Sequence, residues 1–321
     1  IKGTVSDKTH LHYAKGCGIT DKSTGGFEEA VKAAAQSDVA IVVLGGIEGM
    51  GPDTTCGEGR DRMNLTLPGV QQQLLEEVYR TGTPIVLVVI SSNPMDLTWA
   101  QDHIPAIIQA WSPGQVAGNA IADVIFGKEV PGGKLPLTMP KGVGQIPLYY
   151  NRKPVFEDPN CVTAYVDGPN GYLYPFGHGL SYTEFEYSDL TFASRKVDAG
   201  GSVTLSFIVK NVGDKAGEEV AQVYFHDCEA SVSRPVKELV GFQRIHLDKG
   251  ESCRITVTVK VEMLAFYDED MNFIVEPGNM EVFVGSSSED IRLRDRFEIT
   301  GNTVIFNERK VFSSKVTVER L

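Results

Sequence analysis

The chain has 321 residues, of which 42% are hydrophobic and 22% charged, a composition typical of soluble globular proteins large enough for two domains. Its formal net charge of −12 comes from 42 acidic and 30 basic residues spread along the chain. This distribution argues against a nucleic-acid partner, because such binding depends on clustered Lys and Arg. Apolar runs such as PIVLVVI are too short to cross a bilayer, so no membrane partner is expected.

From residue 26 to about residue 140, helical and strand patterns alternate. GGFEEAVKAAAQSD places its apolar residues on one helical face and leads into VAIVVLGG, a β-branched run ended by glycines. A second helix is predicted to begin at Pro68, and PIVLVVISS, AIIQAW and a helix in GQVAGNAIADVIFG follow. This order predicts a mostly parallel sheet with helices on both faces, which binds ligands at the carboxyl ends of its strands.

The second part of the chain has a different texture. Residues 141–185 are rich in Pro, Gly, Asn and Tyr, which predicts an ordered linker rather than a flexible one. Residues 186–321 contain short strands separated by turn signals such as NVGDKAG, as in a β-sandwich of immunoglobulin or fibronectin type. The last ~20 residues fit neither pattern and are expected to pack elsewhere as a C-terminal tail. The predicted fold class is therefore α/β plus all-β, with an α/β sandwich domain at 1–140 and a β-sandwich at 186–321.

Metal and cofactor motifs are absent from the sequence. The five cysteines are scattered without a C-x-x-C pair, and both a Cys228–Cys253 pair and isolated buried thiols remain open. The six histidines do not cluster, and His10 with His12 makes a poor metal site without a further ligand. No P-loop, G-x-S-x-G or G-x-G-x-x-G motif occurs, so we expect no metal and no cofactor.

One carboxylate stands out, in the stretch TTCGEGRDRMNLTLPG. Glu58 lies between two glycines in the loop that leaves the carboxyl end of the first predicted strand. From its residue type alone, a loop glutamate is more often a solvated surface group than a catalytic acid. Asp61 and Arg62 either orient Glu58 or form an exposed ion pair that contributes under ~1 kcal/mol.

Two tryptophans are alternative contacts for a sugar. Trp99 and Trp111 have rings large enough to stack on a pyranose, but both lie near predicted strands. Core packing is therefore the more common role for such residues.

Several motifs resemble glycoside hydrolase family 3. GEGRDRMNLTLPGVQQQLLEEV is similar to the acid/base segment of that family, which typically reads E-G-x-D-R followed by L-x-L-P-G-x-Q. AWSPGQVAGNAIADVIFGKEVPGGKLPLTMP and GQIPLYY resemble the rest of its second domain, and DGPNGYLYPFGHGLSYTEFEYSDL its link to a fibronectin type III-like domain. RPVKELVGFQRIHLDKGES and LAFYDEDMNFIVEPGNMEVFVGSSS resemble that last domain. The motifs follow the family's order from about residue 10 to about residue 290.

The resemblance implies a retaining β-glycosidase with two carboxylates. An aspartate attacks the anomeric carbon, and a glutamate first protonates the leaving oxygen and then deprotonates water. The family motif assigns the general acid/base role to Glu58, with Asp61 and Arg62 as supporting residues. The flanking glycines are interpreted as letting this loop reach a nucleophile on another domain.

The chain departs from the family in one respect. The family's nucleophile lies in an N-terminal (β/α)₈ barrel, and neither that barrel nor the first strand of the second domain is present. We therefore expect the chain to be the C-terminal portion of a longer or nicked enzyme. Its partners would be the missing barrel and a β-linked oligosaccharide or aryl glycoside, and the chain alone would be inactive.

The implied function is that of an exo-acting β-glucosidase acting on terminal non-reducing β-linked sugars. A β-xylosidase of the same family is an alternative, because the missing barrel holds most contacts to the terminal sugar. A catalytically silent carbohydrate-binding or scaffold module is a second alternative. We expect a secreted or periplasmic location for the complete protein.

Overall fold

The computed structural model describes all residues except 155–164, 167 and 169–170. The chain forms two compact units, each of which draws on separate segments. The α/β unit contains residues 1–129, 139–147 and 164–173, and the sandwich unit contains 130–138, 148–163 and 174–321. The predicted linker at 141–185 lies partly outside the described residues, as does Cys161.

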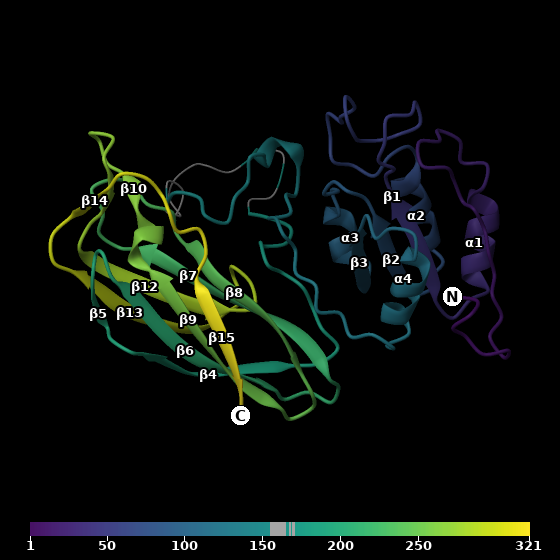
Figure 1. The fold of residues 1–321 in the computed structure, drawn as a ribbon. Helices are drawn as coiled ribbons and strands as arrows, with labels where there is room; N and C mark the ends of the chain where they lie inside the picture. The colour runs from purple at the N-terminus through teal and green to yellow at the C-terminus, as the bar shows by residue number, and fades with distance from the viewer. Residues whose placement is uncertain (155–164, 167, 169–170) are drawn as a thin grey trace. The chain divides into compact units, whose positions relative to one another are not determined.

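The α/β unit alternates helices and strands along the chain, as its sequence predicts (Figure 1). Its elements are α1 (Phe27–Ala35), β1 (Ala40–Gly45), α2 (Gln71–Tyr79), β2 (Ile85–Ile90), α3 (Thr98–His103), β3 (Ala106–Trp111), α4 (Ala117–Ile125) and the 3₁₀ turn η1 (Val143–Gln145).

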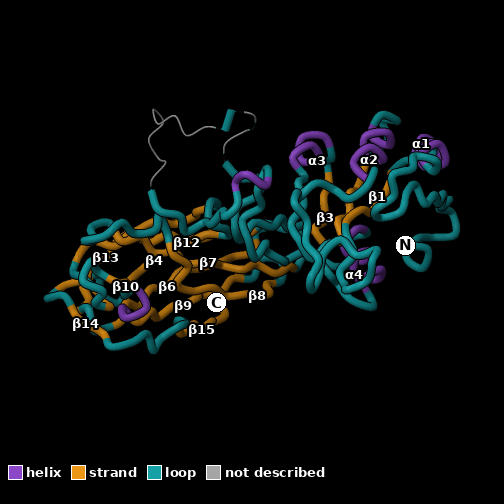
Figure 2. The backbone as a smooth tube through the Cα atoms, turned by 90° about the horizontal axis from the view of Figure 1, so that it is seen from above, coloured by secondary structure: helices purple, strands orange, loops and turns teal. Residues whose placement is uncertain are grey.

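The sheet of this unit is parallel throughout, with the strand order β1-β2-β3. Figure 2 shows α1, α2 and α3 on one face of the sheet and α4 on the other. The central strand β2 is the most buried, with Leu87, Val88 and Val89 each 0% exposed. A near-continuous β-branched run suits a strand covered on both faces, so this part of the prediction is confirmed.

The predicted start of α2 at Pro68 is wrong. The helix begins at Gln71, because Gly69 adopts φ +57° and breaks the helical path just after the proline. A Cβ at Gly69 would lie 2.4 Å from the carbonyl oxygen of Asp21, so the close approach of two backbone segments requires glycine there.

In the described part of the sandwich unit, every regular element is a strand except the 3₁₀ turn Val261–Leu264. Its elements are β4 (Phe185–Phe192), β5 (Lys196–Asp198), β6 (Ser202–Asn211), β7 (Gly217–Asp227), β8 (Glu238–Leu247), β9 (Ser252–Lys260), η2 (Val261–Leu264), β10 (Phe266–Tyr267), β11 (Phe273–Val275), β12 (Gly278–Gly285), β13 (Ile291–Thr300), β14 (Val304–Phe306) and β15 (Lys315–Arg320).

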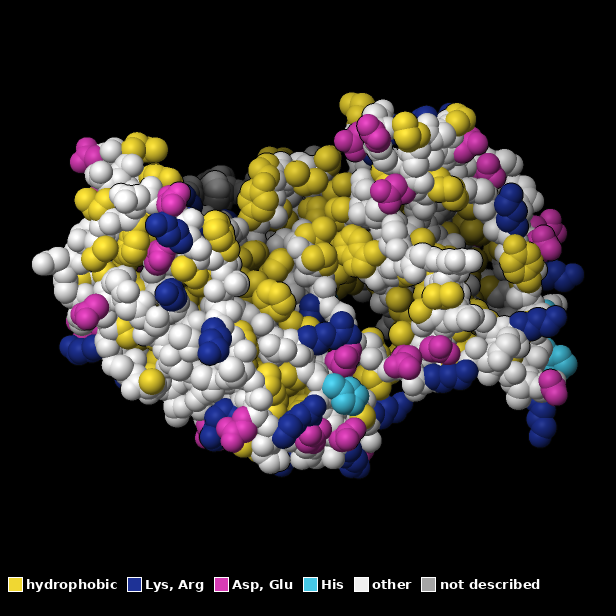
Figure 3. Space-filling view, in the orientation of Figure 1, with side chains coloured by type: hydrophobic (Ala, Val, Ile, Leu, Met, Phe, Trp, Pro, Cys, Tyr) yellow, Lys and Arg dark blue, Asp and Glu magenta, His cyan; other side chains and the backbone are white. Residues whose placement is uncertain are grey.

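Two sheets pack face to face in this unit, with the orders β5-β13-β12-β7-β8 and β15-β9-β6-β4. Alternate residues of each strand fill the core, as in β6, where Val203, Leu205, Phe207 and Val209 are at most 1% exposed. On the face shown in Figure 3, acidic and basic side chains lie interspersed over these strands, consistent with cross-strand ion pairs such as Arg296–Glu281.

The C-terminal residues correct another prediction. Residues 315–320 do not pack elsewhere but form β15, which pairs antiparallel with β9 at the edge of the four-stranded sheet. The strand reads KVTVER, and its outer residues are exposed and charged. Edge strands are often polar, which hides the alternation by which a strand is recognised in a sequence.

Among the described residues, no helix combines the length and the apolar character needed to cross a membrane.

Candidate active site

Glu58 lies at the tip of a tight turn, here called the Glu58 turn (residues 57–60). The backbones of Gly57 and Arg60 exchange two hydrogen bonds, of 3.1 and 3.0 Å, which leaves Glu58 and Gly59 as the two central residues. Gly59 adopts φ +68° at the third position, where a type II turn needs a positive φ. The Glu58 side chain is exposed, and within the described residues it forms no hydrogen bond or ion pair.

The other flanking glycine serves close packing. A Cβ on Gly57 would lie 2.3 Å from the carbonyl oxygen of Gly49, in the first half of the same loop. The two halves also share hydrogen bonds from Gly49 N–H to Cys56 O (3.0 Å) and from Thr55 N–H to Ile47 O (2.8 Å). The two glycines of the Glu58 turn therefore allow the close packing and the backbone conformation that hold the glutamate in place.

The loop continues from the carboxyl end of β1, where the chain crosses over the end of β2. Gly45 has φ +141°, and a Cβ there would lie 1.9 Å from Ile90 O. Gly46 N–H donates to the same carbonyl at 2.9 Å. Further along the loop, the buried thiol of Cys56 lies 3.2 Å from Ser92 Oγ, just beyond the end of β2. Glu58 is thus held near the sheet edge at which parallel α/β sheets bind ligands.

Arg62 stabilises the loop and does not contact Glu58. Its guanidinium donates hydrogen bonds to Met95 Sδ (3.4 Å), Asn64 Oδ1 (3.1 Å) and Thr66 O (2.5 Å). Partial burial lowers the pKa of this guanidinium, which nevertheless stays protonated at neutral pH. The exposed Asp61 accepts a hydrogen bond from the backbone N–H of Arg62.

Neither supporting residue contacts Glu58. In the part of the chain that the structure describes, no ion pair joins the Asp61 and Arg62 side chains, and neither side chain is bonded to Glu58. Their role as supporting residues stays a prediction.

Gln71 is a structural residue of this site that the sequence reasoning did not single out. Its amide accepts from Gly45 N–H (2.7 Å) and donates to Gly45 O (2.8 Å) and Ile19 O (2.8 Å). The side chain is 2% exposed, and these bonds fix the end of β1 to the start of α2. Gln71 is the glutamine of the L-P-G-x-Q pattern, and that pattern could have indicated its importance in the sequence.

The carboxyl end of β3 contributes a strained backbone. Trp111 is not a glycine yet has φ +54°, and its carbonyl accepts a hydrogen bond from Ser91 N–H at 3.1 Å. The neighbouring Gln109 donates to Ser91 O at 3.4 Å, while its buried Oε1 has no partner among the described residues. Such strain and unsatisfied polar groups concentrate at functional sites.

Trp99 lies in helix α3, which precedes strand β3 in the chain. Its ring stacks on His103 with 4.3 Å between the ring centroids, and Tyr79 contacts it edge-on at 5.4 Å. These contacts assign Trp99 a packing role. Trp111 remains the candidate for contact with a sugar.

The described cysteines and histidines do not form a metal site. Cys17, Cys56, Cys228 and Cys253 are all free thiols, so the Cys228–Cys253 pair is not formed. No group of three or more potential metal-ligating His, Cys, Asp or Glu side chains occurs among the described residues.

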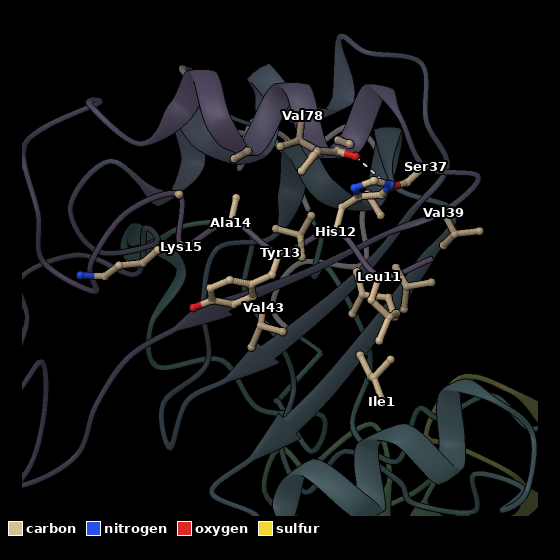
Figure 4. Close-up of a pocket in the computed structure, with 18 of the residues that line it drawn as sticks. Ile1, Leu11, His12, Tyr13, Ala14, Lys15, Ser37, Val39, Val43 and Val78 are labelled. Atoms are coloured by element: carbon tan, nitrogen blue, oxygen red, sulfur yellow. Dashed lines mark hydrogen bonds between the residues drawn. The ribbon is translucent and has the colours of Figure 1, made fainter. Parts of the chain in front are cut away.

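A large cavity of about 1320 Å³, here called the groove, opens beside β1 and away from Glu58. It is lined by residues 8–19, by parts of α1 and β1 and by a few residues of α2, β2 and α4, whereas no residue of the 47–70 loop lines it. Figure 4 shows Leu11, Tyr13 and Val43 directed into it. β1 pairs only with β2 among the described strands, so the groove runs along an open sheet edge.

Comparisons with known proteins match both parts of the chain to known domains. The glycosyl hydrolase family 3 C-terminal domain matches residues 3–182, and a fibronectin type III-like domain matches residues 219–288. A periplasmic beta-glucosidase of Salmonella typhimurium is 40% identical over 91% of this chain and 41% of its own length. A beta-xylosidase of Formosa agariphila is 39% identical over 90% of this chain and 39% of its own length.

Solved structures give the same result. The crystal structure of a beta-glucosidase from Listeria innocua in complex with glucose superposes with a TM-score of 0.82 at 33% identity. It covers 89% of this chain, which in turn covers 40% of that protein. The chain therefore spans about two fifths of the length of these relatives. Since the family match covers more than half of the chain, this protein belongs to glycoside hydrolase family 3.

Proposed function

We propose that this chain supplies the general acid/base, Glu58, to an exo-acting retaining β-glycosidase that hydrolyses terminal non-reducing β-linked sugars. The observation that carries the proposal is the geometry of the Glu58 turn. It presents an exposed carboxyl group, without a partner among the described residues, on an anchored loop at the edge where parallel α/β sheets bind ligands. We favour a β-glucosidase, because both the Salmonella and the Listeria relatives carry that name.

In this proposal Glu58 acts in both half-reactions. First, its carboxylic acid donates a proton to the glycosidic oxygen while a carboxylate from another domain attacks the anomeric carbon, so the leaving alcohol departs neutral. Glu58, now a carboxylate, then takes a proton from a water molecule that attacks the same carbon and releases the sugar. This cycle restores both carboxyl groups.

The nucleophile would come from the N-terminal barrel of the complete protein. Two carboxyl groups of a retaining pair stand about 5 to 5.5 Å apart. Asp61 is the nearest carboxylate in sequence, but it turns back to the backbone of Arg62. The relatives' greater length leaves room for a further domain that carries the second carboxylate.

We also propose an occupant for the groove, namely an extended, apolar strand that belongs to the complete protein and pairs with β1. A cavity of about 1320 Å³ exceeds a typical small-molecule pocket of roughly 300–1,000 Å³. Its apolar lining along an open strand edge suits strand addition, in which main-chain hydrogen bonds continue the sheet. The strand would extend the sheet from three strands to four.

The test of the catalytic role is Glu58→Ala in the complete protein. Substrates with poor leaving groups, such as disaccharides, should lose about 10²–10⁴-fold in kcat/KM, because they need protonation of the departing oxygen. A dinitrophenyl glycoside should lose far less in its first half-reaction, and added azide should restore turnover by replacing the base-activated water.

Glu29→Gln, on the exposed surface of α1, is the matched control and should behave as the unaltered enzyme. Equal losses for both leaving groups, with no azide effect, would count against an acid/base role for Glu58.

A β-xylosidase is the second candidate, because the Formosa relative with that name is nearly as similar as the beta-glucosidases. Assay of the complete protein on a panel of nitrophenyl glycosides separates the two sugars directly. We further propose a secreted or periplasmic location, which the name of the Salmonella relative supports.

A further inference from the structure

Arg60 closes the Glu58 turn and also reaches across the loop. Its backbone provides both hydrogen bonds to Gly57, and its guanidinium Nη1 donates a third bond, of 2.9 Å, to the carbonyl oxygen of Gly51. Gly51 belongs to the first half of the loop, so the Arg60 side chain connects the two halves beside the glutamate.

The acceptor of this bond is itself well fixed. Gly51 O also accepts hydrogen bonds from Thr54 Oγ1 (2.7 Å) and from Thr54 N–H (3.2 Å). These bonds close a turn at residues 51–54 and hold the carbonyl in one orientation. The Arg60 guanidinium is therefore bonded to a carbonyl group whose position is fixed.

The hydrogen bond from Arg60 to Gly51 O contributes more to the position of the Glu58 turn than to the stability of the fold. Arg60 is exposed, and exposed polar contacts of this kind add little to global stability. The folded loop keeps other anchors, including the contact of the Cys56 thiol with Ser92 Oγ (3.2 Å) and the Gly49–Cys56 backbone bond (3.0 Å). Loss of the guanidinium should leave the fold intact while the outer part of the loop, which carries Glu58, becomes less constrained.

We propose that Arg60 is a positioning residue for general acid catalysis, which holds the Glu58 carboxyl group at a fixed place above the sheet. This inference rests on the proposed function of Glu58. Proton transfer depends steeply on geometry, and misplacement by about 1 Å can cost about 10²-fold in rate. The guanidinium acts through the loop and does not itself take part in proton transfer.

The experiment compares Arg60→Met and Arg60→Lys in the complete protein. Arg60→Met should lower kcat for a disaccharide by roughly 10- to 100-fold and change the first half-reaction of a dinitrophenyl glycoside by less than about 3-fold. Arg60→Lys should recover part of the loss, because its ammonium group can still donate to Gly51 O. KM should change little in both variants.

The matched control is Arg80→Met at the end of α2, where an exposed arginine pairs with Glu77 at 2.5 Å. This variant should leave both substrates unaffected. Melting temperatures of all three variants should lie close to that of the unaltered protein, which separates a positioning effect from a folding effect.

Glu58→Ala, measured in parallel, separates the inference from the function on which it rests. If Glu58→Ala shows the leaving-group dependence and azide rescue but Arg60→Met loses activity equally on both substrates or not at all, the positioning role is wrong and the catalytic role stands. If Glu58→Ala lacks that signature, the proposed function fails and the inference with it. Where Arg60→Met also melts at a lower temperature than the unaltered protein, Arg60→Lys decides between the two explanations. If Arg60→Lys regains disaccharide turnover but not the melting temperature, the positioning role is supported. If it regains both together, the positioning role is overturned.

Discussion

His178 is a residue of the sandwich unit whose protonation is altered by its surroundings. Its imidazole stacks on Tyr174 with 5.0 Å between ring centroids, and the backbone N–H of His178 closes a turn by donating to Pro175 O. Burial, together with the nearby positive charge of Lys134, lowers the pKa of His178, and Asp290 opposes this shift. The folded protein therefore favours the neutral imidazole.

The sign of this shift predicts a loss of stability in acid. The pKa of His178 in the folded chain lies below its unfolded value of about 6.5. As the pH falls through about 6.5, the unfolded chain therefore binds the proton more readily than the folded chain, and stability is lost. The melting temperature should fall between pH 7 and pH 5 by roughly 1–3 °C more for the unaltered chain than for His178→Tyr. His246→Tyr, at an exposed position, is the control for replacing an imidazole by a tyrosine ring. An identical pH dependence in His178→Tyr would show that this imidazole does not contribute.

At the scale of elements, β1 is an edge strand of the α/β sheet: among the described strands it pairs with β2 on one side, and its other side is open along the groove. Val39 and Val43 are 52% and 56% exposed although they belong to or adjoin a β-branched strand beside an apolar groove. Exposed apolar strand edges attract further strands, and soluble proteins normally cover or charge them. The open edge of β1 is therefore consistent with an additional strand in the complete protein.

A charge placed in the groove should interfere with that strand. In a two-piece reconstitution with a barrel-bearing fragment that includes the apolar strand, Val43→Lys should weaken association by roughly 10-fold or more, because a buried ammonium group is strongly unfavourable. Val318→Lys, on the edge strand β15 of the sandwich unit, is the matched control. Titration of the two pieces, followed by light scattering, measures the effect. Equal affinities for both variants would exclude the groove as the docking place.

At the scale of the whole molecule, the chain carries one half of a proposed catalytic pair. Glu58 is presented by the α/β unit, and the relatives that share the fold are about two and a half times as long as the matched region. A lone acid cannot stabilise the oxocarbenium-like transition state, which needs an opposing carboxylate about 5 Å from the acid. Under the proposed function, the reaction would therefore depend on a group outside this chain.

It follows that the purified 321-residue chain should not hydrolyse a nitrophenyl glucoside. Turnover should appear only when a barrel-bearing piece is added and the two associate, and it should then depend on Glu58. Turnover by the chain alone that disappears in Glu58→Ala would overturn this prediction and reveal a second carboxylate within these residues.

Much of the fold could be predicted because it depends on local patterns. The β-branched runs at β1 and β2 and the alternation in β6 appear directly in the sequence, and the structure confirms them. The position of Glu58 between glycines was equally visible. Its anchoring by Cys56 and Ser92 was not, because those residues are 36 positions apart.

Hydrophobic periods and motif spacings are properties of neighbouring residues, so they were enough to predict the two kinds of unit and the family and to single out Glu58 as the candidate acid. How distant segments combine could be seen only in the folded chain. Residues 130–138 join the sandwich unit, where Lys134 forms a buried ion pair of 3.0 Å with Glu219. Residues 315–320 complete a sheet, and Gln71 fastens the end of β1. Each of these depends on contacts between residues far apart in the chain, whose free energy comes from burial and from hydrogen bonds that no local pattern records.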